Sequence, residues 1–217
     1  MIKLLDLLIE QESILIPRRS PEERRKNYLI ATQKKIQQYI KDGGKGDLIL
    51  SNTPITSLPQ GLTIGGDLYL QSTPITSLPQ GLTVGGNLYL FNTPITSLPQ
   101  GLKVRGNLNL SHTPITSLPQ DLKVGGSLYL QGTSITSLPQ GLTVRGYLDL
   151  ENTPITSLPQ DLKVGGSLDL QNTPITSLPQ GLTVGGELYL KNTPLSKNNT
   201  IEQIKTMAPG VKGDIFI

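Results

Sequence analysis

The 217-residue chain contains no cysteine, no tryptophan and a single histidine. Without cysteine it cannot form a disulfide framework, a thiolate zinc site or a cysteine nucleophile. One histidine leaves little for metal binding or for general-base catalysis. Hydrophobic residues (35%) and charged residues (16%) are both scarcer than in ordinary globular proteins. These shortages argue against most enzymes, so we expect a non-catalytic protein without a cofactor or a metal.

Long apolar runs are missing as well. No window approaches 18 consecutive apolar residues, which argues against a membrane-spanning helix. The apolar part of MIKLLDLLIEQ is too short for a signal peptide, and it is interrupted and followed by acidic residues. We therefore expect the protein in the cytoplasm of the producing or infected cell, with a virion or secreted location left open.

Glycine, proline and small polar residues take the place of the missing types, and they recur at a fixed period. The chain contains 23 Gly and 17 Pro, and it nearly repeats itself every 20 residues from about Gly46 to Pro194. One unit, residues 65–84, reads GGDLYLQSTPITSLPQGLTV. A short fixed period is typical of a solenoid, in which each coil buries its apolar side against its neighbours. The sequence predicts such a solenoid over residues 46–195.

Each unit contains one short strand. In Leu68-Tyr69-Leu70 the apolar residues alternate, so both leucines are expected inside and the tyrosine outside. Pro74 follows soon after and limits the strand, because proline cannot donate a hydrogen bond to a sheet. We expect the equivalent strands to stack as one parallel sheet; they begin at Leu48, Leu68, Leu88, Leu108, Leu128, Leu148, Leu168 and Leu188.

Two small residues are the same in every unit. A glycine stands two residues before each strand, as at Gly66, and we expect it to provide a positive φ or a close approach of neighbouring coils. A threonine follows each strand, as at Thr73, and we expect its hydroxyl to bond the backbone of an adjacent coil.

The unit L-x-L-x-x-T-x-I-x-x-L-P-x-x-L, as in Leu68–Leu82, resembles a leucine-rich repeat. It is most similar to the short bacterial subtype with L-P-x-x-L that occurs in type III secreted effectors, and similar V-G-G-x-L-x-L arrays occur in tailed phages and marine bacteria. The resemblance implies a leucine-rich-repeat-like stack of 20-residue coils with a parallel sheet face. Two departures, threonine for the family's inward asparagine and Gly65 for an expected leucine, leave the curvature open, with a flatter β-solenoid as the alternative.

Residues 1–45 are predicted to form an N-terminal helical cap. Ser20-Pro21-Glu22-Glu23 has the spacing of a capping box, and Gly43-Gly44 would end the helix after about Asp42. One face of this helix is expected to cover the first coil; it comprises Leu29, Gln33, Ile36 and Ile40. A preceding short helix is expected to pack on the cap through Leu4, Leu5, Leu7, Leu8 and Ile9.

Residues 196–217 are predicted to cap the other end. Thr200 and Gln203 have the spacing of a second capping box, which predicts a helix from Ile201 to about Ala208. The final segment, VKGDIFI, resembles the VGGNLYL of residues 84–90, and this predicts a ninth strand.

The outward strand positions differ from coil to coil, whereas the framework barely changes. Tyrosines and acidic residues gather there, and exposed aromatic residues on a rigid sheet are typical of protein interfaces. The competing interpretation is that tyrosine simply favours strands. The predicted partner-binding residues are Tyr69, Tyr89, Phe91, Asn109, Tyr129, Tyr147, Asp149, Glu151, Asp169 and Tyr189.

Other polar groups suggest less. Asp149, Glu151 and Asp169 could serve acid–base chemistry or calcium, but their spacing matches no calcium motif, so we expect a solvated acidic surface or a contact for a basic partner. His112 is expected to be a turn residue. A basic cluster near the N-terminus could contact nucleic acid or an acidic partner, although a solvated helix face is the expectation; it comprises Arg18, Arg19, Arg24, Arg25 and Lys26.

The sequence therefore favours a non-catalytic scaffold that binds a protein partner on its strand face. The resemblance implies a phage or bacterial protein that acts on host proteins, although the catalytic cysteine of the effectors' ubiquitin-ligase domain is missing. The alternative is a structural, virion-associated or surface-binding array, including one that binds ice through threonines. We expect no membrane partner, and self-association through the tyrosine face stays open.

Overall fold

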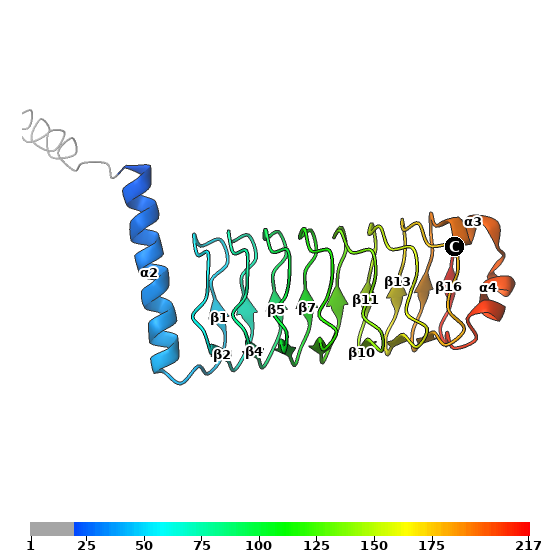
Figure 1. Cartoon of the computed structure of the whole chain (residues 1–217), viewed down its shortest axis with the longest axis horizontal. Coiled ribbons are helices and arrows are strands. Elements are labelled where there is room, and N and C mark those ends of the chain that lie inside the picture. Colours follow the sequence, from blue (N-terminus) through cyan, green and yellow to red (C-terminus); the bar gives the residue numbers. More distant parts are fainter. Residues whose placement is uncertain (1–19) are drawn as a thin grey trace, which may run out of the picture.

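The computed structural model describes residues 20–217, which form a parallel β-solenoid of stacked 20-residue coils with helices at both ends (Figure 1). This architecture confirms the predicted fold class. The segment Leu4–Ile9, for which a preceding helix was expected, lies outside the described residues.

The main sheet has nine parallel strands, and each coil contributes one of them. Neighbouring strands pair in register, so Leu68 lies beside Leu88 and Tyr69 beside Tyr89. The inward leucines are fully buried, as expected from their alternation. The strands, in spatial order, are β1 (Leu48–Ile49), β3 (Leu68–Tyr69), β5 (Leu88–Tyr89), β7 (Leu108–Asn109), β9 (Leu128–Tyr129), β11 (Leu148–Asp149), β13 (Leu168–Asp169), β15 (Leu188–Tyr189) and β16 (Ile215–Phe216).

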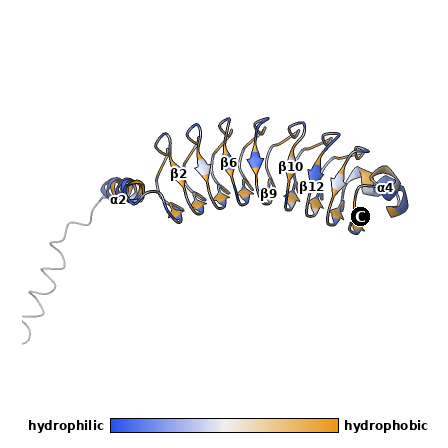
Figure 2. Ribbon diagram, turned by 90° about the horizontal axis from the view of Figure 1, so that it is seen from below, coloured by the Kyte–Doolittle hydropathy of each residue, from blue (hydrophilic) through white to orange (hydrophobic). Residues whose placement is uncertain are grey.

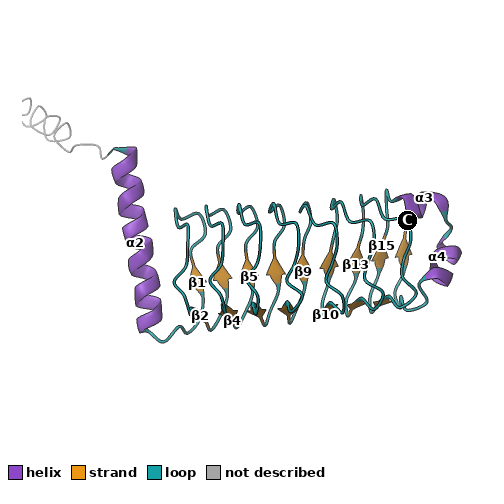
Figure 3. Ribbon diagram, viewed as in Figure 1, coloured by secondary structure: helices purple, strands orange, loops and turns teal. Residues whose placement is uncertain are grey.

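A second side of most coils carries another short strand, which the sequence analysis did not predict (Figure 3). These strands form two separate parallel sheets with one buried valine or isoleucine per strand. The first sheet comprises β2 (Thr63–Ile64), β4 (Thr83–Val84), β6 (Lys103–Val104) and β8 (Lys123–Val124). The second comprises β10 (Thr143–Val144), β12 (Lys163–Val164) and β14 (Thr183–Val184). We call these two sheets the outer sheets.

The stack curves gently, and the nine-stranded sheet lines the inner side of the arc (Figure 2). The hydrophobic core runs along the whole stack as one cluster from Ile36 in the N-terminal helix to Ile215 in the last strand. Because every coil buries its leucines against both neighbours, no coil has an independent core.

The invariant glycine is required by the close approach of neighbouring coils. A Cβ atom added at Gly66 would lie 2.6 Å from the carbonyl carbon of Gly46, and one at Gly106 would lie 2.8 Å from that of Gly86. Among these invariant glycines only the first, Gly46, has a positive φ. Of the two expected explanations, close approach therefore applies to the later coils.

The bend after each strand differs from the expectation. The Thr73 hydroxyl donates to the Leu70 carbonyl oxygen of its own coil at 2.7 Å, and the equivalent threonines do the same. The expected bond to an adjacent coil is therefore wrong, because the left-handed residue that precedes the threonine turns the chain back on itself. That residue has φ between 56° and 65° and is Asn, Ser, His or Gly: Asn52, Ser72, Asn92, His112, Gly132, Asn152, Asn172 and Asn192. The prediction that His112 is a turn residue is confirmed.

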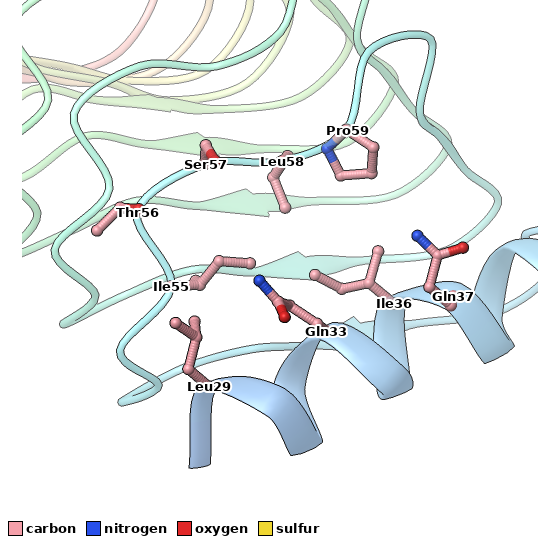
Figure 4. A pocket seen from close by; sticks show the side chains of 9 residues that line it. All are labelled: Leu29, Gln33, Ile36, Gln37, Ile55, Thr56, Ser57, Leu58 and Pro59. Atoms are coloured by element: carbon pink, nitrogen blue, oxygen red, sulfur yellow. The ribbon is translucent and has the colours of Figure 1, made fainter. Parts of the chain in front are cut away.

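Helix α2 (Pro21–Lys41) forms the N-terminal cap. The Ser20 hydroxyl accepts from the Glu23 amide while the Glu23 carboxylate accepts from the Ser20 amide, which confirms the predicted capping box. Ile36 is buried against the first coil, as expected, and Leu29 and Gln33 line a hollow of about 440 Å³ between the helix and that coil (Figure 4).

The predicted role of Ile40 is wrong, because its side chain is 43% exposed. Tyr39 takes its place and orients the end of α2. The Tyr39 hydroxyl lies 2.6 Å from the Gly44 carbonyl oxygen and 2.9 Å from that of Gly46, and it accepts from the Gly65 amide at 3.2 Å. These bonds rotate the helix so that Thr32, Ile36 and Tyr39 face the coil.

The C-terminal end is closed as predicted. Strand β16 extends the main sheet beside β15, and helix α4 (Ile201–Met207) begins at a capping box between Thr200 and Gln203. A further helix, α3 (Pro194–Asn198), was not predicted. Among the helices of residues 20–217, none combines the length and apolar character that crossing a membrane requires.

Candidate functional site

The outward side chains of the nine-stranded sheet form three parallel columns on the inner side of the arc. We call this surface the inner sheet face. Its columns contain the positions equivalent to Asp67, Tyr69 and Gln71 in the coil that carries β3. All ten predicted partner-binding residues lie in these columns.

The first column is mainly structural, which the sequence analysis missed. The Asp67 carboxylate accepts from the Asn87 amide at 2.7 Å, and the Asn87 side chain accepts from the Asn107 amide at 2.7 Å. Asp47, Asn107, Ser127 and Ser167 make the same bond to the next coil. At these six positions the variation is therefore limited to short side chains with an acceptor oxygen.

The first column has two exceptions, Tyr147 and Glu187, of which Glu187 accepts from the Ser167 hydroxyl. The aromatic side chain of Tyr147 does not accept from the next coil, and its hydroxyl instead donates to Asp169 at 3.0 Å. Its ring lies 5.8 Å from the ring of Tyr129, at an angle of 55°. The Tyr147 side chain thus makes no hydrogen bond to the amide of the next coil. It contacts two other predicted binding residues, Tyr129 and Asp169, instead.

A second aromatic pair lies near the N-terminal end of the face. The rings of Tyr69 and Tyr89 stack with centroids 4.8 Å apart and planes 17° from parallel. The Tyr69 hydroxyl also donates to Asp67 at 3.1 Å. Phe91 is partly buried, and within residues 20–217 it takes part in no stacked ring pair, so it lies outside this pair.

A third pair closes the C-terminal end of the face. Tyr189 stacks on Phe216 of the last strand, with centroids 5.0 Å apart and planes 11° from parallel. Phe216 was not among the predicted residues, although its position in the echo VKGDIFI matches that of Tyr89 and could have identified it. Asn109 lies between the first and second pairs. Its side chain accepts a hydrogen bond from the Ser111 amide of its own coil at 3.0 Å.

The acidic cluster comprises Asp149, Glu151 and Asp169, whose carboxylate oxygens lie within 4.8 Å of one another. Asp169 is only 6% exposed, so the expectation of a solvated surface is wrong for this residue. Tyr147 covers it, and Gln171 donates to it through both its amide nitrogen and Nε2, at 2.9 and 3.0 Å. The carboxylate oxygens of Asp169 are therefore already used as acceptors within the fold.

The surroundings of this cluster make one member, Asp149, easier to protonate than a free aspartate side chain. Burial raises the pKa of Asp149 to about 6; the Glu151 amide opposes this shift, and the charges of Asp169 and Glu151 add to it. Burial and the carboxylates of Asp149 and Asp169 also raise the pKa of Tyr147. Glu151 is held by Gln131, whose Nε2 donates to it at 2.7 Å.

These three carboxylates are the one group in residues 20–217 whose ligand atoms lie close enough to share a metal ion. Two of the three already accept backbone amide bonds, from Glu151 to Asp149 and from Gln171 to Asp169. The described part of the basic cluster, Arg24, Arg25 and Lys26, lies exposed on α2, as a solvated helix face would; Arg18 and Arg19 lie outside the described residues.

Comparison with protein-family models and with curated protein sequences finds no match.

Proposed function

We propose that the protein is a non-catalytic scaffold that binds a protein partner on its inner sheet face. The observation that carries this proposal is the contrast within each coil. The leucines, glycine and threonine repeat almost unchanged, whereas the outward side chains differ from one coil to the next. A rigid frame with varied side chains on one concave side is suited to the recognition of a specific surface.

The aromatic pairs supply the anchors for such a partner. They lie at three points along the face, around Tyr69, Tyr129 and Tyr189. Tyrosine rings offer a large contact area and lose little conformational freedom on binding. Because in-register strands hold the rings in place, a partner would not have to order them.

The acidic cluster indicates the chemistry of the partner. Glu151 and Asp149 are partly exposed beside Tyr129 and Tyr147. A lysine or arginine placed there would pair with these carboxylates and stabilise the charged form of Asp149. The partner surface that fits has a basic residue opposite the acidic cluster and apolar groups opposite the tyrosine pairs.

The family and origin are part of the same proposal. The L-P-x-x-L unit and the sheet on the inner side of the arc support membership of the short leucine-rich repeats. A phage or bacterial protein of this kind would act by binding host proteins. The ice-binding alternative has less support, since Thr73 and its equivalents are 4% exposed or less in the coils after the first; we expect no thermal hysteresis.

The proposal is tested by affinity capture from a lysate of the source or its host. Bait proteins are the wild type and the triple variant Tyr69→Ala/Tyr89→Ala/Tyr129→Ala. The control is Thr76→Ala/Thr96→Ala/Thr116→Ala, which changes three exposed residues outside the sheet. Circular dichroism and urea unfolding first establish that all three proteins fold.

We expect one protein to be captured by the wild type and the threonine variant and lost with the tyrosine variant. Equal capture by all three would move the site off the inner sheet face. No capture by any of them would favour the structural array and contradict the scaffold.

A further inference from the structure

The outer sheets carry a hollow of about 880 Å³ that is lined by basic residues. We call it the outer groove; the cations in its lining are Lys103, Arg105, Lys123 and Arg145. All four are exposed. The outer sheets, whose strands β6, β8 and β10 contribute to the lining, lie on a different side of the coils from the nine-stranded sheet (Figure 2).

These cations occupy positions that are neutral in most other coils. The positions of Lys103 and Lys123 are threonine in β2, β4, β10 and β14, and those of Arg105 and Arg145 are glycine at residues 65, 85, 125, 165 and 185. Lys103 also lies directly beside Lys123 in the parallel register. Like charges in this arrangement are unfavourable, so the repeat alone gives no reason to place them there.

One residue of the groove lining, Arg145, has a backbone amide that differs from its equivalents in the other coils. In the other coils the amide at this position donates to the valine or isoleucine carbonyl of the preceding coil at 2.8–3.0 Å; these amides belong to Gly85, Arg105, Gly125, Gly165 and Gly185. Within residues 20–217 the Arg145 amide has no such bond, because the outer sheet is interrupted between β8 and β10. Arg145 thus lines the groove together with the other three cations, and within the described residues its N–H has no backbone partner.

Gly125 is the residue of the groove lining that stands at the equivalent position between Arg105 and Arg145 in successive coils. A Cβ atom at this residue would collide with the backbone carbonyl oxygen of Arg105, so the close approach of the two coils admits no side chain at this position of the lining. The carboxylate in the lining, Asp121, accepts from the Gly101 amide at 2.8 Å and is thereby held to the equivalent turn of the preceding coil. The groove thus combines a net positive charge, a residue whose amide has no backbone partner and a position in the lining that admits no side chain.

We propose that the outer groove binds a small anion with two or more phosphate groups. Arginine binds phosphate oxygens in a bidentate manner, and lysine adds a compact positive charge. One phosphate would lie over Gly125 between the arginines and accept from the Arg145 amide. A second would lie between Lys103 and Lys123, whose repulsion it would relieve. This site is separate from the inner sheet face and does not depend on the proposed function.

The test is calorimetric titration with inorganic tripolyphosphate at low ionic strength, together with amide NMR. The variant Arg105→Gly/Arg145→Gly places in the groove the residue that other coils have at these positions, so the fold is retained. We expect binding by the wild type, a shift of the Arg145 amide resonance during the titration, and affinity weakened about tenfold or more in the variant. Lys103→Thr/Lys123→Thr is expected to weaken binding in the same way.

The matched control is Lys45→Gly, which exchanges a cation for glycine at the equivalent position outside the groove. It is expected to bind like the wild type. ATP distinguishes the source of the phosphate chain: equal affinity for ATP and tripolyphosphate points to the chain alone, and tighter ATP binding to a nucleotide. The proposal is overturned if the wild type does not bind, or if the arginine variant and Lys45→Gly weaken binding equally.

Discussion

Asp149→Asn tests the electrostatics of the acidic cluster. The pKa of Asp149 is raised from 3.8 to about 6 in the folded protein, mainly by burial. The folded state therefore holds the proton more tightly than the unfolded chain does. The contribution of this group to stability is complete below about pH 4 and is lost as the pH rises toward 6. Asparagine keeps the shape and the acceptor for the Glu151 amide but cannot become charged.

The magnitude follows from the size of the shift. A change of about two pKa units corresponds to roughly 3 kcal/mol of unfolding free energy. Because Asp149 is partly exposed, solvent screening reduces this to roughly 1–2 kcal/mol. The variant should thus be more stable than the wild type by about that amount at neutral pH. Below about pH 4 the two proteins should be nearly equal, since the wild-type carboxyl is then protonated in both states.

The assay is urea unfolding, followed by circular dichroism, at several pH values between about 4 and 7.5. The informative quantity is the difference in unfolding free energy between variant and wild type, because all other titrating groups are shared. A difference that stays constant across this range would refute the argument that burial raises the pKa of Asp149. If the variant were less stable than the wild type at neutral pH, the stability difference would have the opposite sign to the one expected, and the argument would also be refuted.

The remaining predictions concern the framework, and each is measured by urea unfolding against the wild type. Tyr39→Phe should cost about 1–3 kcal/mol, because its hydroxyl bonds the backbone on both sides of the first junction; an unchanged midpoint would contradict this role. Gly106→Ala should cost about 1–3 kcal/mol through the clash with Gly86. Asn152→Gly should be nearly neutral, since Gly132 takes the same conformation, whereas Asn152→Val should cost about 1–2 kcal/mol at φ 56°. Equal effects of the two Asn152 variants would argue against a left-handed turn.

Much of the site was also accessible from the sequence, because period-two alternation determines which strand residues point outward. The ten predicted residues lie on the inner sheet face, and Tyr129, Tyr147 and the acidic cluster do come together there. The structural use of the first column was not accessible. Asp67 and Asn87 look like varied surface residues until the next coil's amide is placed within 2.7 Å of their oxygens.

The sequence by itself determined the coil, its strand, its inward leucines and the caps at both ends, because these depend on local spacing and on a repeat that every coil must satisfy. The tertiary structure decided what depends on the distance between coils. It showed why Gly66 admits no side chain, that Tyr39 rather than Ile40 faces the first coil, and that Asp169 is buried beneath Tyr147. Such features arise from residues about one period apart or more, whose contact depends on how closely the coils stack.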